Sequence, residues 1–196
     1  MTTRAEATRA RLQSAALDLF EERGYRAVTV EEIAAAAGVS HMTFFRHFPT
    51  KERVLLDDPF DPVIAAAVAA QPTGMPPIER IARGLVSLAP LLDQEPTAQA
   101  RRAIAIAARE PDLQAGMAAN TAATERAIVE AAATAGDEPA MRIAAAACLA
   151  AVTAVLLGWA TDGSTRTLGE LVSTAMTTVV PALAEAQVPA FARATP

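Results

Sequence analysis

Apolar side chains recur at helical spacing along almost the whole chain. In residues 4–23, Leu12, Ala16 and Phe20 fall on one face of a helix that Gly24 ends. The same spacing predicts a short helix over residues 63–70, and longer helices over about 77–94, 97–109, 111–134, 138–161 and 166–186. No stretch alternates apolar and polar residues as a half-exposed strand does. The pattern therefore predicts an all-α protein.

Prolines divide this pattern. The run Asp57-Asp58-Pro59-Phe60-Asp61-Pro62 interrupts the helical spacing, because proline lacks a backbone N–H and disfavours helix in the residue before it. We expect a domain boundary and hinge there, between an N-terminal domain (residues 1–56) and a C-terminal domain (residues 57–196). Pro90 and Pro181 lie inside helical patterns and predict kinks.

Residues 28–48 predict two short helices joined by a tight turn. Thr29 and Glu32 have the spacing of a capping box, which satisfies the unpaired amides at a helix start. Gly38 stands where a left-handed residue ends that helix, and Ser40 can cap the next one. Phe44 and Phe48, four residues apart, form its inner side. Two short helices joined in this way are a helix-turn-helix, whose second helix enters the major groove of DNA.

The segment GVSHMTFFRHFPTKERVL resembles the DNA-binding signature of the TetR (tetracycline-repressor) family of bacterial transcriptional regulators. The matching positions span about residues 8–56. They include Gly38-Val39, Ser40, Thr43, Phe44-Phe45, His47-Phe48 and Thr50-Lys51-Glu52. The resemblance implies a three-helix helix-turn-helix head followed by a helical body that binds a ligand and dimerises. One position departs from the family: Phe45 stands where a tyrosine hydroxyl often reaches a phosphate.

The predicted DNA contacts are the polar and exposed positions of the two short helices and the next turn. Arg46 can bridge O6 and N7 of guanine, whereas Thr43 or Met42 can meet a thymine methyl. His47 and Lys51, the only lysine in the chain, resemble phosphate contacts. The alternative is a solvated helix face with no partner. The full set is Thr29, Ser40, His41, Met42, Thr43, Phe45, Arg46, His47 and Lys51.

Composition and charge agree with a helical protein that has a local DNA-binding region. Alanine, the best helix former, supplies 49 of 196 residues. Residues 1–55 carry eight Arg/Lys against seven Asp/Glu, and the rest carries nine against fifteen. What counts for DNA binding is the local patch rather than the net charge of −5. The relatively basic part is the predicted head.

The last two long helices carry an apolar seam, and the resemblance to the TetR family implies that they form a homodimer with their symmetry mates. Apolar residues in residues 138–161 repeat at spacings of three and four, and an adjacent face of small residues allows close approach of two backbones. The predicted interface residues are Leu149, Val152, Leu156, Val172 and Val179. The alternative is packing within one subunit. Residues 143–160 are also apolar enough for a membrane span, but their many alanines favour a buried bundle helix, and we expect no membrane association.

The resemblance to the TetR family implies a ligand pocket among the middle helices, and each of its candidate walls is more readily explained as plain core. They are Phe60, Leu91, Arg102, Ile106, Met117 and Trp159. No catalytic constellation, metal site or cofactor motif occurs, and the lone Cys148 suits a reducing cytoplasm. The sequence predicts a non-enzymatic, cytoplasmic repressor that binds a palindromic operator in double-stranded DNA and is released by a small, largely apolar effector. The alternatives are a ligand-independent architectural DNA-binding protein and a helical carrier or enzyme.

Overall fold

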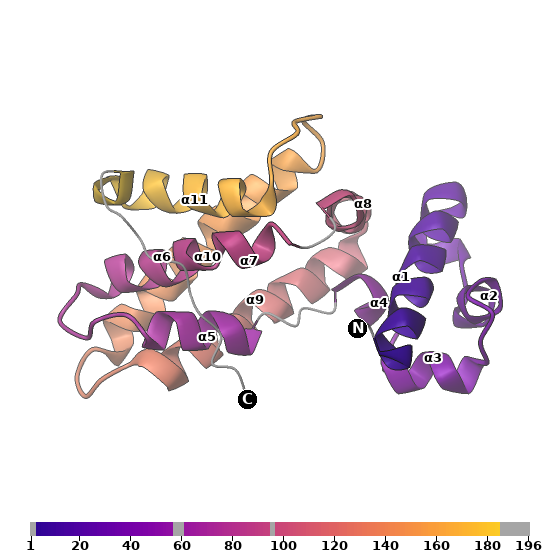
Figure 1. Cartoon of the computed structure of the whole chain (residues 1–196), viewed down its shortest axis with the longest axis horizontal. Coiled ribbons are helices and arrows are strands. Elements are labelled where there is room, and N and C mark those ends of the chain that lie inside the picture. The colour runs from indigo at the N-terminus through magenta and orange to yellow at the C-terminus, as the bar shows by residue number, and fades with distance from the viewer. Residues whose placement is uncertain (1–2, 57–60, 95–96, 185–196) are drawn as a thin grey trace. The chain divides into compact units, whose positions relative to one another are not determined.

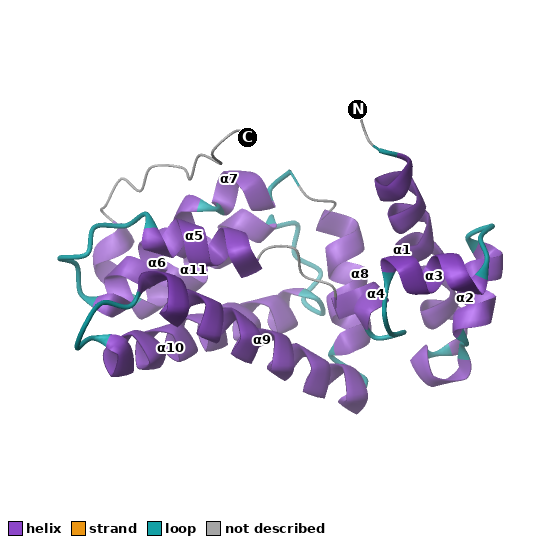
Figure 2. Ribbon diagram, turned by 90° about the horizontal axis from the view of Figure 1, so that it is seen from below, coloured by secondary structure: helices purple, strands orange, loops and turns teal. Residues whose placement is uncertain are grey.

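The computed structural model describes residues 3–56, 61–94 and 97–184, and all regular elements in these ranges are helices (Figures 1 and 2). The chain forms two compact units. The N-terminal unit contains residues 1–57 and 98–118, and the C-terminal unit contains residues 58–97 and 119–196. The first division lies beside the predicted one at 56/57, but residues 98–118 join the N-terminal unit. The prediction of an all-α fold is confirmed.

The N-terminal unit begins with α1 (Arg4–Arg23), η1 (Tyr25–Ala27) and α2 (Val30–Ala36). It continues with α3 (His41–His47) and α4 (Arg53–Leu56). Two later segments complete it, α8 (Thr97–Ala107) and the first part of α9 (Pro111–Ala132). Thr3 and Glu6 form a capping box at the start of α1, and Gly24 ends that helix with a positive φ of 83°.

One apolar core holds this unit together. Its innermost residues from the segment 4–56 are Leu12, Ala16, Phe20, Tyr25, Ile33, Phe44, Phe48 and Val54. Ala107 of α8 and Leu113 of α9 are almost completely buried in the same core. Helices α8 and α9, which come more than forty residues after α4, therefore complete the core of the N-terminal unit.

The C-terminal unit comprises α5 (Asp61–Ala69), α6 (Pro77–Ser87), α7 (Ala89–Leu92), the rest of α9, α10 (Glu138–Trp159), α11 (Leu168–Val179) and η2 (Pro181–Ala184). The helix predicted over 77–94 is divided at Leu88, because Pro90 has no N–H to continue the ladder. Likewise α11 ends just before Pro181. Both predicted interruptions are confirmed.

Helix α6 is central in this unit and packs against α5, α10 and α11. Gly84 allows the closest approach, since a Cβ at this position would lie within 2.9 Å of the Val68 backbone. Arg80 is buried on the same helix and donates to the Ala132 carbonyl oxygen at the end of α9, 2.7 Å away. This bond satisfies a carbonyl that the helix itself leaves unpaired.

Candidate nucleic-acid interface

Helix α2 is bounded at both ends by local hydrogen bonds. The Glu32 amide donates to Thr29 Oγ1 (3.2 Å), and the Thr29 amide donates to Glu32 Oε2 (2.8 Å), so the predicted capping box is confirmed. At the other end Gly38 has a φ of 66°, and the amides of Gly38 and Val39 donate to the carbonyls of Ala35 and Ala34. This Schellman motif turns the chain towards α3.

Helix α3 has one buried and one exposed side. The Thr43 amide donates to Ser40 Oγ (3.2 Å), which confirms Ser40 as the cap. Phe44 and Phe48 have no exposed surface, whereas Met42 and Phe45 are 64% and 40% exposed. The inner side therefore docks α3 on the core, and the outer side faces away from that core.

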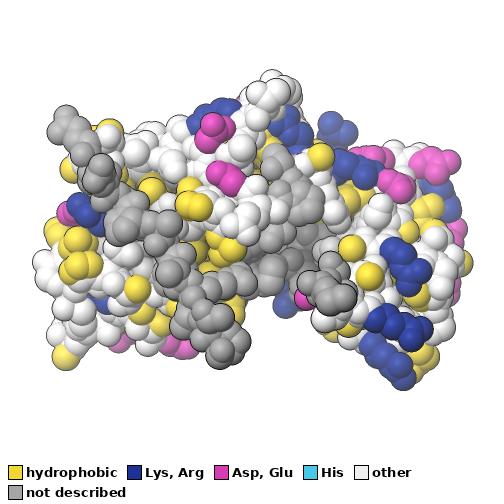
Figure 3. Space-filling model, in the orientation of Figure 1, with side chains coloured by type: hydrophobic (Ala, Val, Ile, Leu, Met, Phe, Trp, Pro, Cys, Tyr) yellow, Lys and Arg dark blue, Asp and Glu magenta, His cyan; other side chains and the backbone are white. Residues whose placement is uncertain are grey.

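The predicted base-contacting residues lie together on this outer side. Arg46 is exposed and makes no hydrogen bond within the described ranges. His41 Nε2 lies 3.4 Å from Glu31 Oε1, and its ring meets the Phe45 ring edge-on at 4.7 Å. The Ser40 and Thr43 hydroxyls are 2.9 Å apart. Figure 3 shows Lys and Arg side chains over α1 and α3 of the head.

Two cations near α3 turn inward. Lys51 Nζ donates to the carbonyl oxygens of Tyr25 (3.0 Å) and Val28 (3.1 Å) and lies 4.1 Å from the centre of the Tyr25 ring. Arg9 of α1 donates to the His47 carbonyl oxygen (3.0 Å) and lies over the Phe48 ring at 4.3 Å. The sequence indicated Lys51 only as a phosphate contact and did not single out Arg9. Neither intramolecular role has a local sequence signal, because the partners lie 23 to 38 residues away.

Tyr25, the only tyrosine in the chain, connects η1 to the turn before α4. Its hydroxyl donates to Glu52 Oε1 (2.9 Å), and burial together with this acceptor raises the pKa of Tyr25 well above its usual range. The hydrogen bond from the Thr50 side chain, followed by weaker donors that include Tyr25, lowers the pKa of Glu52. Tyr25 stays protonated and Glu52 stays ionised at neutral pH, so the bond between them persists.

Sequence comparisons agree with this geometry. Residues 12–57 match the profile of the bacterial regulatory proteins of the tetR family, and residues 75–184 match that of the MftR C-terminal domain, which covers more than half of the chain. The chain belongs to the TetR family. Such proteins are DNA-binding transcriptional regulators and not enzymes, so these two predictions are confirmed.

Individual relatives match over part of the chain. The transcriptional regulator TcmR of Streptomyces glaucescens is 43% identical over 74 residues, which cover 37% of this chain and 33% of TcmR. The repressor Rv3405c of Mycobacterium tuberculosis is 44% identical over 55 residues, covering 28% and 29%. The matched part of the chain thus spans about a third or less of these relatives.

Solved structures share the fold over most of the chain. SmeT in complex with triclosan has a TM-score of 0.61 at 22% identity and covers 90% of this chain and 91% of its own. SmeT is the repressor of the Stenotrophomonas maltophilia multidrug efflux pump SmeDEF. NalD, the secondary repressor of the MexAB-OprM efflux pump in Pseudomonas aeruginosa, has a TM-score of 0.58 at 18% identity and covers 90% and 95%.

The described residues predicted to line a ligand pocket divide between the two units. Ile106 and Met117 pack against the head core, and Arg102 bonds Asp18 and Glu21 of α1. Trp159 is 1% exposed and donates from Nε1 to the Arg166 carbonyl oxygen (3.1 Å). Leu91 of α7 is half-buried, and Phe60 lies outside the described residues.

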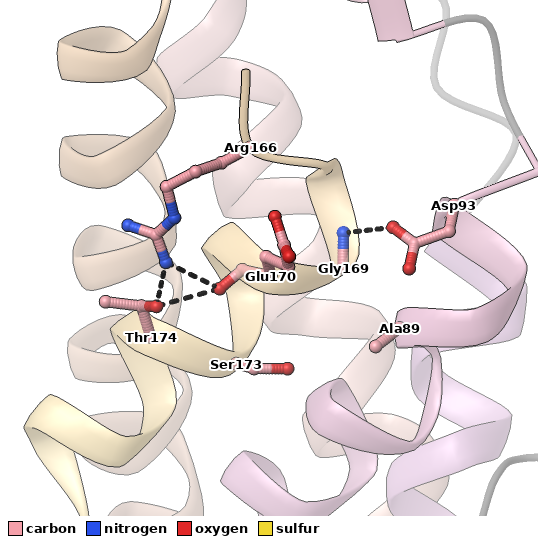
Figure 4. A pocket seen from close by; sticks show the side chains of 7 residues that line it. All are labelled: Ala89, Asp93, Arg166, Gly169, Glu170, Ser173 and Thr174. Carbon is pink, nitrogen blue, oxygen red and sulfur yellow. Dashed lines mark hydrogen bonds between the residues drawn. The ribbon is translucent and has the colours of Figure 1, made fainter. Parts of the chain in front are cut away.

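An open depression of about 470 Å³ in the C-terminal unit has none of these residues in its wall. Helix α11 and the loop before it meet α7 there (Figure 4), and the lining residues are Ala89, Asp93, Arg166, Gly169, Glu170, Ser173 and Thr174. Its polar groups already bond one another. Asp93 Oδ1 accepts from the Gly169 amide (2.8 Å), and Arg166 donates to the Glu170 carbonyl oxygen and the Thr174 hydroxyl.

The residues predicted for the dimer interface are buried or half-buried within the protomer itself. Leu149 and Val172 are buried in the core of their own unit, with Val152 and Val179 packed beside them, and Leu156 is half-buried. The exposed positions of α10 begin with Glu138, Pro139, Ala140 and Arg142, and after Arg142 they are the apolar or small residues Ile143, Ala146, Ala147, Ala150, Ala154 and Gly158. By length and composition this helix could cross a membrane. Only 28% of its most apolar stretch is buried within the protomer. It therefore carries an apolar face without a partner in the described part of the protomer.

Proposed function

We propose that this TetR-family protein is a cytoplasmic, homodimeric repressor that binds a palindromic operator and leaves it when a small, largely apolar molecule binds the C-terminal unit. The observation that carries the proposal is the two-sided α3. Phe44 and Phe48 are completely buried, while Met42, Phe45 and Arg46 stand exposed on the other side. A short helix docked in this way is what a helix-turn-helix inserts into a major groove.

The proposed contacts divide by chemistry. His41, Met42, Thr43 and Arg46 face base edges, and Phe45 contributes an apolar contact with a sugar or a thymine methyl. His47 lies at the end of α3 and is proposed to meet phosphate. The hydroxyls of Thr29 and Ser40 cap α2 and α3. Both residues are proposed for the interface because they stand at the starts of these two helices.

The proposed dimer surface is the exposed face of α10 around Ile143. A 22-residue helix this apolar gains free energy when a second copy covers it. Small residues at 147, 154 and 158 let two such helices approach closely, and a Cβ added at Gly158 would meet nothing within its own protomer. A two-fold dimer also sets two recognition helices about 34–36 Å apart, to match successive major grooves.

The proposed release step uses α9. Its first part contributes Leu113 to the head core, and its last part contributes Ile128 to the core of the C-terminal unit. A ligand that displaces the last part would therefore act on a helix that also belongs to the head. The hinge predicted at residues 57–62 falls largely outside the described residues. The triclosan complex of SmeT supports an apolar effector by likeness of fold alone.

Selection of binding sites from a pool of random duplexes tests the proposal. We expect two inverted half-sites with centres about one helical turn apart. Arg46→Ala should relax preference at one position of each half-site, at a cost of roughly 1–3 kcal/mol. Arg126→Ala removes another exposed arginine, in the part of α9 that belongs to the C-terminal unit, and is the matched control, with an unchanged preference. Enrichment of no sequence would reject operator recognition.

Release is tested by linkage. Apolar molecules, triclosan among them, are screened by thermal shift, and each hit is titrated with and without the selected duplex. Allosteric coupling of about 1–3 kcal/mol should lower ligand affinity roughly 5- to 150-fold on DNA. Equal ligand affinity in both titrations would favour a ligand-independent architectural protein.

A further inference from the structure

Glu31 of α2 is an acidic side chain that lies beside the recognition helix. Its Oε1 atom is 3.4 Å from Nε2 of His41, the first residue of α3, and the two side chains are 67% and 48% exposed. Glu31 makes no other side-chain hydrogen bond or ion pair within residues 3–56, 61–94 and 97–184. The next residue, Glu32, instead completes the capping box and pairs with Arg23. The fold therefore leaves one carboxylate on the surface next to α3.

The pair of Glu31 and His41 can bind a third group. Their separation of 3.4 Å is longer than the roughly 2.7–3.2 Å of an ordinary N–H···O hydrogen bond. The His41 ring is positioned instead by aromatic contacts, because it meets the Phe45 ring edge-on at 4.7 Å and Phe45 meets the completely buried Phe44 at 5.4 Å. A carboxylate accepts hydrogen bonds and an imidazole N–H donates one. The pair thus offers an acceptor and a donor side by side.

A carboxylate in this place has a cost when α3 enters a major groove. The first residues of a recognition helix are those that contact base edges, and His41 is the first residue of α3. The phosphates of the duplex are negative, so an unpaired carboxylate beside α3 weakens the binding of every sequence. A hydrogen bond from a base offsets this cost. Among the bases, cytosine presents the N4 amino donor that Glu and Asp accept from.

We propose that Glu31 is a specificity-determining residue, which reads one C·G base pair of each half-site together with His41. The inference rests on the proposed entry of α3 into the major groove. There a C·G pair presents the N4 donor of cytosine beside the O6 and N7 acceptors of guanine.

The geometry of the two side chains matches that base pair. N4 and O6 are hydrogen-bonded to each other within the pair, so they are about 2.9 Å apart. The acceptor of Glu31 and the donor of His41 are 3.4 Å apart, and they present the complementary order. Glu31 accepts from N4 while the His41 N–H donates to O6. An A·T pair also presents a donor beside an acceptor, but guanine offers His41 a second acceptor in N7.

The test compares Glu31→Ala with Glu22→Ala, which removes another exposed glutamate from the last turn of α1. Each protein selects sites from random duplexes, and affinities are then measured for the selected duplex and for duplexes changed at one base pair. In Glu31→Ala we expect the preference for C·G at one position of each half-site to fall roughly 5- to 150-fold, the equivalent of one base contact. His41→Ala should reduce the preference at the same position. Glu22→Ala should keep every preference.

Three results would overturn the inference. The first is a uniform gain of affinity for all duplexes in Glu31→Ala with every preference kept, because Glu31 would then only repel phosphates. The second is no change in affinity or preference. The third is a pair other than C·G, selected by the unmodified protein at the position that depends on Glu31.

Folding and operator recognition are controlled separately. Near-ultraviolet circular dichroism of Tyr25, the only tyrosine, shows whether each variant keeps the N-terminal unit folded. If Glu31→Ala does not fold, Glu31→Gln decides, since it keeps the size of the side chain and should exchange C·G for A·T, because an amide pairs with adenine. An unchanged C·G preference in Glu31→Gln would then overturn the inference. Failure of the unmodified protein to enrich any duplex would instead reject the proposed operator recognition itself.

Discussion

Arg102→Met should loosen α8 from α1 within the N-terminal unit. Arg102 was expected to line a ligand pocket, but its guanidinium donates to Asp18 Oδ1 (2.6 Å) and to both carboxylate oxygens of Glu21 (2.8 and 2.7 Å). Methionine keeps most of the apolar stem and removes all three donors. The substitution therefore tests the charged contact with little change in packing.

The magnitude follows from the exposure of the three side chains. Arg102, Asp18 and Glu21 are 33%, 66% and 45% exposed, so solvent screens the pairs. Exposed ion pairs contribute roughly 0.2–1 kcal/mol each, and the bidentate geometry with Glu21 favours the upper end. We expect a loss of about 1 kcal/mol, which lowers the melting temperature of a unit of this size by roughly 4–8 °C.

The chain provides separate probes for its two units. Tyr25, the only tyrosine, belongs to the N-terminal unit, and Trp159, the only tryptophan, belongs to the C-terminal unit. Thermal unfolding of Arg102→Met should shift the tyrosine transition in near-ultraviolet circular dichroism. Arg83→Met is the matched control, because Arg83 pairs with Glu79 within α6 of the C-terminal unit and should leave that tyrosine transition in place.

The effect should also depend on pH. The hydrogen bond from Arg102 is the main reason why the pKa of Glu21 lies below its usual value. A lowered folded-state pKa gives a contribution that is complete above the unfolded-state pKa, about 4.3, and is lost as pH falls through the folded value. The variant and the unmodified protein should therefore differ at neutral pH and converge in acid. An unmoved tyrosine transition at neutral pH would refute the reasoning.

Three further substitutions or measurements test other parts of the structure. Ile143→Glu places a charge on a side chain that is 72% exposed in the protomer, so sedimentation should show a dimer turned to monomer, whereas Ala131→Glu on the exposed side of α9 should leave the dimer intact. Gly84→Ala forces a Cβ against the Val68 backbone and should cost roughly 1–3 kcal/mol, seen as an earlier Trp159 transition. Burial raises the pKa of Cys148 to about 11, so alkylation at neutral pH should proceed at the rate of unfolding, and fast labelling of the folded protein would contradict that burial.

The helices and the helix-turn-helix could be predicted from the sequence because their signals are local. Thr29 and Glu32 are three residues apart, Ser40 caps the amide of Thr43, and the left-handed Gly38 needs only its own lack of a side chain. Apolar spacing predicted that Phe44 and Phe48 are buried and that the intervening positions face outward. Each of these features depends on atoms within one or two helical turns.

Only the tertiary structure decided which groups the lysine and arginine side chains bond. It also decided which later helices complete the N-terminal unit. Arg102 meets Asp18 across 84 residues, and Lys51 meets Tyr25 across 26. Leu149 and Val172 have the same apolar spacing as an interface seam, yet they lie in the core of their own unit. Periodicity shows which face of a helix is apolar, but it does not show which segment covers that face. Flexible charged side chains likewise take whichever carbonyl, ring or carboxylate the folded chain brings within reach.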